Sequence, residues 1–199
     1  MRLLLQRVSR ARVDIGGETA GQIGPGLLVL AGFGKADGLE LPGTRTWRAL
    51  CDKLLDLRVF PDQDGKLNLS LKDTAQAGAA LAGGAPGPAG EAADPTGEAA
   101  DPTGDAAVLL GKPPGLLLVS QFTLYADTRR GRRPSFTDAA PPDVAQALYD
   151  RLCADLAAAC AQAGLAFATG RFGAEMHLTF TNWGPVTILL DSDEFKGKG

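Results

Sequence analysis

The sequence predicts a single mixed α+β domain, in which a curled, barrel-like and mainly antiparallel sheet packs with two principal helices. Three observations predict this architecture. The 199 residues have ordinary globular composition, with 45% hydrophobic and 22% charged residues, so the chain can bury one sizeable core. Short apolar runs separated by glycine-containing turn signals indicate several strands. Two longer stretches repeat apolar residues at helical spacing.

The first half of the chain is expected to form two strands, a helix and two further short strands. Residues 3–8 and 27–31 are apolar runs separated by the turn signals IGGE and IGPG. Residues 44–57 form an amphipathic pattern, with apolar positions three or four residues apart: Trp47, Leu50, Cys51, Leu54 and Leu55. The short strands are expected in LRVF and LNLSL, on either side of the turn PDQDGK.

The second half contains the most apolar strand. GLLLVSQFTLY, residues 115–125, is typical of a central strand whose polar C-terminal end opens at a site. Residues 142–163 repeat apolar positions at helical spacing, between Pro141 and Gly164. Three strands are expected at 165–169, 175–181 and 186–190, the last two separated by NWGPVT. A Gly-Pro is unusual there, because two-residue hairpins favour Asn-Gly or Asp-Gly.

Residues 74–114 differ in composition from the rest. They are rich in Ala, Gly and Pro and carry the tandem repeat EAADPTG at 91–97 and 98–104. With few β-branched residues and no aromatic residue to form a core, this segment is predicted to be a disordered, acidic surface insertion. The folded domain is therefore expected to comprise residues 1–73 and 115–192, followed by a flexible C-terminal tail at 193–199.

Composition excludes several classes of function. His177 is the only histidine, which removes sites that need two His ligands, and it falls on a strand face where an exposed role is favoured over that of a catalytic base. Three cysteines without a CxxC motif favour buried thiols over a disulfide framework. No metal and no cofactor is expected, no apolar run is long enough to cross a membrane, and a cytoplasmic location is predicted.

Two groups of residues could carry chemistry or binding. Ser120, Gln121 and Thr123 lie at the end of the predicted central strand, where hydroxyl and amide groups could converge. They do not form a GxSxG elbow, so a Ser-His-Asp hydrolase is disfavoured against a strand end with polar caps. TRRGRRPSF, residues 128–136, is either a solvated loop or a phosphate contact; its arginines are Arg129, Arg130, Arg132 and Arg133.

Several motifs in order carry a more specific signal. SQFTLYAD, GRRPSF, GRFGAEM and NWGPVT together resemble the D-aminoacyl-tRNA deacylases, the chiral proofreading enzymes of translation. The likeness begins at QRVSRARV, continues through GPGLLVL, LRVF and GKLNLSL, and reaches LLDS. It covers nearly all of the chain except the insertion and the last residues.

The resemblance implies a homodimer with active sites at the interface. Gly184 and Pro185 are expected to form a cis peptide that enters the other subunit's site and excludes L-aminoacyl groups. Ser120, Gln121, Phe122 and Thr123 are expected to line the catalytic pocket. The remaining residues with implied roles are Phe172 and Met176, near the terminal adenosine and aminoacyl group, and Arg7, supporting the Gly-Pro loop.

The resemblance also implies the reaction. The substrate is aminoacyl-tRNA, and no membrane or DNA partner is expected. The enzyme would release D-amino acids from tRNA, and also glycine mischarged onto tRNA-Ala, with the tRNA's terminal 2′-hydroxyl in place of a protein nucleophile.

Three other readings remain open. One is a relative that retains the fold and dimer but edits another mischarged tRNA. Another is a Ser or Thr esterase of small molecules, and the last is a pure interaction module. Activity on matched D- and L-aminoacyl-tRNA separates all of them.

Overall fold

The computed structural model describes residues 1–76 and 113–195, and its main sheet is organised around one long strand. Strand β1 (Arg2–Ile15) pairs along one edge with β8 (His177–Asp191). Its other edge pairs first with β3 (Gly26–Gly32) and then with β2 (Glu18–Ile23), all antiparallel. Each half of β1 therefore has its own neighbour on that edge.

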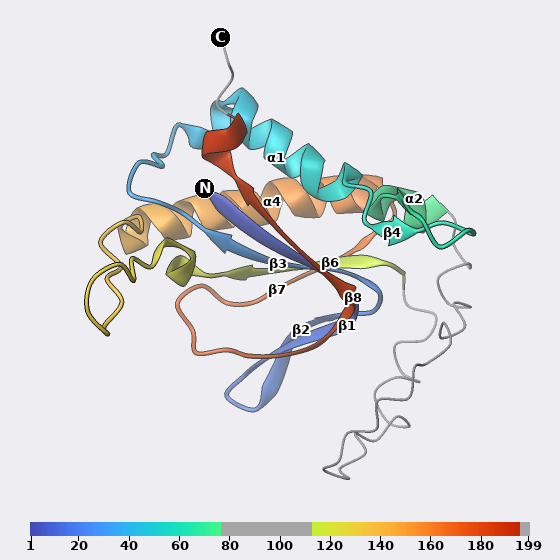
Figure 1. Ribbon diagram of the computed structural model, residues 1–199, viewed down its shortest axis with the longest axis horizontal. Helices are drawn as coiled ribbons and strands as arrows, with labels where there is room; N and C mark the ends of the chain where they lie inside the picture. Colours follow the sequence, from blue (N-terminus) through green and yellow to red (C-terminus); the bar gives the residue numbers. More distant parts are fainter. Residues whose placement is uncertain (77–112, 196–199) are drawn as a thin grey trace.

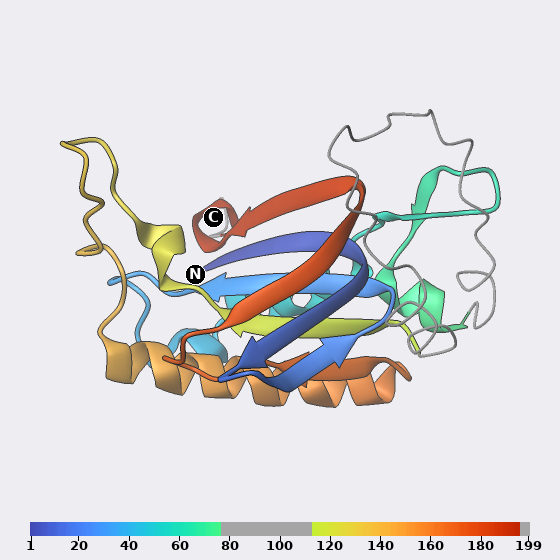
Figure 2. The same ribbon diagram turned by 90° about the horizontal axis from the view of Figure 1, so that it is seen from below.

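The sheet continues from β3 through two parallel strands. β6 (Gly115–Ser120) pairs with β3, and β7 (Ala166–Thr169) pairs with β6. The β2 half then curls back against β7 (Figure 2). At Gly21 the approach is so close that a Cβ atom would lie 2.8 Å from the Thr169 carbonyl oxygen. The sheet is thus the nearly closed, mainly antiparallel barrel that the sequence predicts.

Two helices cover one face of this sheet (Figure 1). Helix α1 (Arg45–Asp56) begins where the Thr44 hydroxyl accepts a hydrogen bond from the Trp47 amide at 3.2 Å. Helix α4 (Pro142–Gln162) has proline in its first turn, a position where the missing N–H costs nothing. The indole N–H of Trp47 donates to Asp155 at 2.8 Å and joins the two helices. Their apolar faces and the sheet enclose the main core.

A second, smaller core fills the inside of the curl. Val8, Val13, Ile23, Leu28 and Leu117 are at most 1% exposed there. The sheet is therefore buried on both faces over its middle, which fixes the end of β6 in position.

The remaining elements are short. Strands β4 (Phe60–Pro61) and β5 (Leu67–Leu69) form a separate ribbon, followed by helix α2 (Leu71–Gln76). Three 3-10 turns complete the described chain: η1 (Leu41–Gly43), η2 (Phe122–Tyr125) and η3 (Ser192–Phe195).

Several expected boundaries differ from the structure. The strand expected at 115–125 ends at Ser120, because the chain turns into η2. The strands expected at 175–181 and 186–190 are one strand, β8, since both parts pair with β1. Strand β2 was not predicted, because ETAGQI lacks an apolar pattern.

The ends of the domain also differ from those expected. Residues 74–76 belong to α2, where Thr74 is 1% exposed and its hydroxyl donates to the Leu71 carbonyl. Residues 193–195 belong to η3, where the Asp193 amide donates to Asp191 and Phe195 packs against the main core. The rest of the predicted insertion and tail, residues 77–112 and 196–199, lies outside the described residues.

Candidate active site

An apolar cavity of about 710 Å³ opens where β6 ends. Its walls come from five parts of the chain: the end of β3, the β6–η2 junction, the loop between η2 and α4, the start of α4, and the loop between β7 and β8 with the start of β8. The main lining residues are Gly32, Phe33, Val119, Ser120, Gln121, Phe122, Phe136, Pro141, Phe172 and Met176.

The cavity brings together five of the residues that the sequence singled out. Ser120, Gln121 and Phe122 all face it, although strand alternation would have put Gln121 on the opposite side. The change of direction into η2 explains this difference. Phe172 and Met176 enter from the loop before β8.

Thr123 is not part of the cavity wall. Its hydroxyl accepts a hydrogen bond from the side-chain amide of Gln121, which does line the cavity. Thr123 can therefore act on the site through the orientation of Gln121.

A buried tyrosine on helix α4 supports the cavity wall. The Tyr149 hydroxyl donates to the Leu118 carbonyl of β6 at 2.9 Å, and its ring lies 5.9 Å from that of Phe172. Burial raises the pKa of Tyr149 well above its ordinary value, so the hydroxyl remains a donor. Helix α4, β6 and the Phe172 loop are thereby held in one arrangement.

Sequence reasoning did not assign Phe136 to the site. Phe136 lines the cavity and packs against Phe122, with ring centroids 5.0 Å apart and planes at 67°. Both rings are exposed, Phe122 by 56% and Phe136 by 39%. The signal in the sequence was a lone aromatic residue after the arginine cluster.

Gly184 and Pro185 lie in a bulge within β8. Asn182 pairs with Val8 and Thr187 with Gln6, so four residues of β8 stand opposite Arg7 alone. The Asn182 side chain closes the bulge, accepting from the Val186 amide at 3.1 Å and donating to the Thr187 hydroxyl at 2.9 Å. The Gly184–Pro185 peptide bond is cis, as expected from the resemblance, and both residues are exposed.

Arg7 holds the base of this bulge. It is 5% exposed and donates to the Trp183 carbonyl at 2.9 Å and to the Val59 carbonyl at 2.5 Å. Its guanidinium carbon also lies 4.5 Å from the centre of the Trp183 ring. Burial lowers the pKa of Arg7. Arg7 therefore contacts both the backbone and the ring of the residue just before Gly184.

The bulge does not face the cavity of its own subunit. Arg7 pairs with Leu27 of β3, which pairs with Leu116 near the start of β6. The cavity lies at the other end of β6, and neither Gly184 nor Pro185 lines it. The two parts of the predicted site are thus separate within one chain.

The four arginines lie on a loop that projects from the body of the molecule, between η2 and α4 (Figures 1 and 2). Its base is closed by paired backbone hydrogen bonds between Asp127 and Ser135, at 2.7 and 2.9 Å. Arg129 forms a salt bridge with Asp127 at 2.7 Å, and this contact holds the pKa of the carboxylate far below its usual range. The remaining three, Arg130, Arg132 and Arg133, are exposed and have no ion pair within the described structure.

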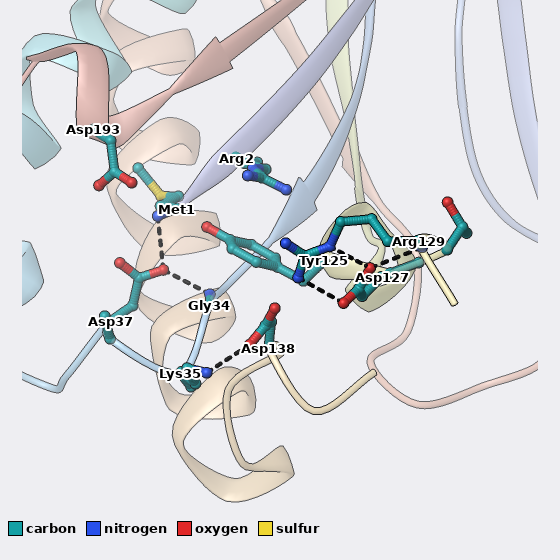
Figure 3. A pocket seen from close by; sticks show the side chains of 13 residues that line it. Met1, Arg2, Gly34, Lys35, Asp37, Tyr125, Asp127, Arg129, Asp138 and Asp193 are labelled. Atoms are coloured by element: carbon teal, nitrogen blue, oxygen red, sulfur yellow. Dashed lines mark hydrogen bonds and ion pairs between the residues drawn. The ribbon is translucent and has the colours of Figure 1, made fainter. Parts of the chain in front are cut away.

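A second cavity, of about 420 Å³, lies beside the first residue of the chain (Figure 3). Its charges neutralise one another. The Met1 ammonium contacts Asp37 at 2.7 Å, and Lys35 contacts Asp138 at 2.6 Å. Arg129 points into it while paired with Asp127. In all, the described cavity lining holds as many cationic groups as carboxylates.

The other residues considered for chemistry are not placed at the cavity. His177 is exposed at the start of β8 opposite Asp14, as the sequence predicted. Within residues 1–76 and 113–195, no three His, Cys, Asp or Glu side chains cluster as a metal site requires. Among the described helices, none has the length and apolar character needed to cross a membrane.

Comparison with known proteins identifies relatives over the whole length. A family profile described as D-Tyr-tRNA(Tyr) deacylase matches residues 4–81 and 107–191. A protein named D-aminoacyl-tRNA deacylase from Nitratidesulfovibrio vulgaris (strain DP4) is 45% identical over 194 residues, covering 98% of this chain and 94% of its own. Its namesake in Solidesulfovibrio magneticus is 45% identical over 201 residues, covering 99% of each chain.

Solved structures agree with the fold. One described as c-Myc DNA Unwinding Element Binding Protein is 30% identical, with a TM-score of 0.67 over 96% of this chain and 98% of its own. Another, described as a probable eukaryotic D-amino acid tRNA deacylase, is 17% identical, with a TM-score of 0.63 over 95% and 97%. With the sequence motifs in register and the profile matching most of the chain, this protein belongs to the D-Tyr-tRNA(Tyr) deacylase family, a family of hydrolases whose similar members are named D-aminoacyl-tRNA deacylase.

Proposed function

We propose that the chain hydrolyses the ester bond of D-aminoacyl-tRNA, releasing the D-amino acid and the tRNA while rejecting L-aminoacyl-tRNA. One observation carries the proposal. The apolar cavity at the end of β6 gathers Ser120, Gln121 and Phe122 with Phe172 and Met176, the same residues to which the family resemblance gives the substrate. Such a reaction belongs with translation in the cytoplasm.

The complete site requires two copies of the chain. Gly184 and Pro185 are exposed and lie away from the cavity of their own subunit, as a segment that serves a partner must. On the same strand, Leu189 and Phe180 are 49% and 37% exposed, one on each side of the bulge. In the homodimer, the bulge of one subunit enters the cavity of the other.

Selection then works by exclusion. A backbone bulge that accepts the substrate's α-ammonium on fixed carbonyl groups leaves room for a side chain on only one side. An L-residue would collide with that backbone, whereas a D-residue points outward. Because no side-chain pocket is involved, many D-amino acids are accepted, and so is glycine mischarged onto tRNA-Ala.

The chain contributes positioning and electrostatic stabilisation to catalysis. No His base lies at Ser120, so the terminal 2′-hydroxyl of the tRNA assists the attack on the ester. In η2 the first backbone hydrogen bond is from Leu124 to Gln121, at 3.3 Å. The N–H groups of Phe122 and Thr123 precede it, and we expect them to stabilise the oxyanion together with the Gln121 amide.

Exposed arginines supply RNA affinity. Arg130, Arg132 and Arg133 project on a loop that begins directly after η2, close to the cavity. Contacts between these side chains and phosphates would orient the tRNA without reading its sequence.

The test is to incubate the purified protein with matched D- and L-aminoacyl-tRNA and to measure the release of the amino acid. Turnover of the D-ester with rejection of the L-ester is expected. Equal turnover of both esters, or of neither, would contradict the proposal. For the mechanism, a substrate ending in 2′-deoxyadenosine should not turn over, whereas Ser120→Ala should only impair positioning. A trapped acyl-enzyme would show instead that a protein nucleophile acts.

A further inference from the structure

Two exposed aromatic rings stand at the mouth of the active-site cavity. Both lie in motifs that carry the family resemblance, but the resemblance gave a role only to Phe122. Phe122 belongs to η2, directly after the cavity residues Ser120 and Gln121. Phe136 belongs to the segment after the arginine loop and meets Phe122 edge-on at 5.0 Å. Large apolar side chains that remain exposed beside a cavity usually mark a contact surface for a ligand.

The backbone around Phe136 is fixed on both sides. Immediately before it, Ser135 is bonded to Asp127 through paired backbone hydrogen bonds of 2.7 and 2.9 Å. After it, the Ala139 amide donates to the Phe136 carbonyl at 3.1 Å, and Ala140 donates to Phe33 of the cavity wall at 2.9 Å. The backbone position from which the Phe136 ring projects is therefore fixed.

Phe122 is less constrained. It is 56% exposed and begins a turn of only four residues. Within the described structure, the aromatic ring that contacts Phe122 is that of Phe136. An edge-to-face pair of this kind favours one orientation of the ring over the alternatives.

We infer that Phe136 is a positioning residue, which holds the Phe122 ring over the cavity mouth so that the terminal nucleoside of the substrate enters in one orientation. The inference rests on the proposed function. It adds that Phe136 acts through Phe122 and not as one more RNA contact of the arginine loop that it follows. Orientation of the reacting ester contributes to the rate, so the effect falls on turnover.

The experiment compares variants on two substrates, D-aminoacyl-tRNA and the same D-amino acid esterified to adenosine alone. Phe136→Ala should lower kcat by about three- to tenfold on both, the range for one aromatic pair. Phe136→Tyr should retain most of the wild-type kcat, because the aromatic ring is kept. The variant with Arg132→Gln and Arg133→Gln should be impaired on tRNA and normal on the adenosine ester, which has no phosphates. Leu39→Ala, which shortens an exposed side chain outside the cavity wall, is the matched control.

A double variant tests whether Phe136 acts through Phe122. Phe122→Ala with Phe136→Ala should be no slower than Phe122→Ala alone, because the second change removes nothing further. Additive losses would overturn the inference, and so would a Phe136→Ala defect confined to tRNA. A general loss of folding would appear as a lowered Tm and a reduced active fraction, with no rescue by the tyrosine.

One measurement needs no substrate. In the free protein, NMR should show a single preferred χ1 rotamer for Phe122. In Phe136→Ala, the χ1 angle of Phe122 should be averaged over several rotamers. An unchanged Phe122 ring in that variant would overturn the inference while leaving the proposed function intact. Wild-type protein that hydrolyses neither D-ester would instead refute the proposed function.

Discussion

Arg7 is the side chain whose removal should damage the Gly184–Pro185 bulge most. In Arg7→Ala, the Trp183 and Val59 carbonyls both lose a charged donor. A hydrogen bond from a charged group contributes about 1.5–3 kcal/mol. Loss of the cation–π contact with Trp183 adds about 0.5–2 kcal/mol. Relief of the cost of burying a charge offsets part of this sum, because burial already disfavours the charged form of Arg7. The expected net loss is about 3 kcal/mol in the free energy of unfolding.

Urea unfolding at fixed protein concentration measures this loss. With a slope of about 2 kcal/mol per molar urea, the midpoint should fall by about 1.5 M. Arg7→Lys should be intermediate, since one ammonium cannot reach both carbonyls in the guanidinium geometry. Arg10→Ala on the same strand is the matched control, and its effect should stay within about 0.5 kcal/mol. The ratio of D- to L-ester hydrolysis should fall in Arg7→Ala alone. A midpoint equal to that of Arg10→Ala would refute the reasoning.

Three further predictions concern other parts of the chain. Gly184→Ala should lower the free energy of unfolding in urea by about 1–3 kcal/mol, because φ is +123° there and the new Cβ would lie 2.5 Å from the Arg7 guanidinium. Gly43→Ala, with open space at its Cβ, is the control, and equal stabilities of the two variants would contradict the prediction. Neutralising Arg132 and Arg133 should reduce the slope of log affinity for tRNA against log salt by about one for each residue, and an unchanged slope would make the loop a solvated one. Burial raises the pKa of the three cysteine thiols to about 11 or about 12, so at pH 8 iodoacetamide should label them far more slowly in native protein than in urea; rapid native labelling, detected by mass spectrometry, would show that the thiols are accessible and ionised.

The sequence predicted those parts of the fold whose pattern is local. The α1 and α4 periodicities and the apolar run of β6 depend on neighbouring residues, and the structure confirms them. β2 escaped prediction because it packs through Gly21, which carries no hydrophobic signal. β8 was divided at Gly184–Pro185 because a proline interrupts a strand pattern, whereas pairing with β1 on both sides keeps the strand continuous.

The site was predictable to a similar extent. The motifs identified five cavity residues, but the family resemblance, not spacing, joined β6 to the distant Phe172 loop. The position of Gln121 depended on η2, a turn that the alternation in FTLY does not reveal. Phe136 was missed because a single aromatic residue in a basic, polar segment has no periodicity to mark it.

The continuity of β8 has a consequence for the accuracy of the proposed enzyme. The bulge is held by ladder pairing on both flanks, Asn182 and earlier residues on one side and Thr187 and later residues on the other. Both ends of the bulge are therefore fixed by the sheet, so it has less freedom than a hinged loop to swing aside and admit the L-isomer. On the proposed role, discrimination between the D- and L-aminoacyl esters should stay nearly constant on warming and disappear only when the sheet melts. As the temperature rises, the amount of active enzyme would then fall before the ratio of D- to L-ester hydrolysis changed.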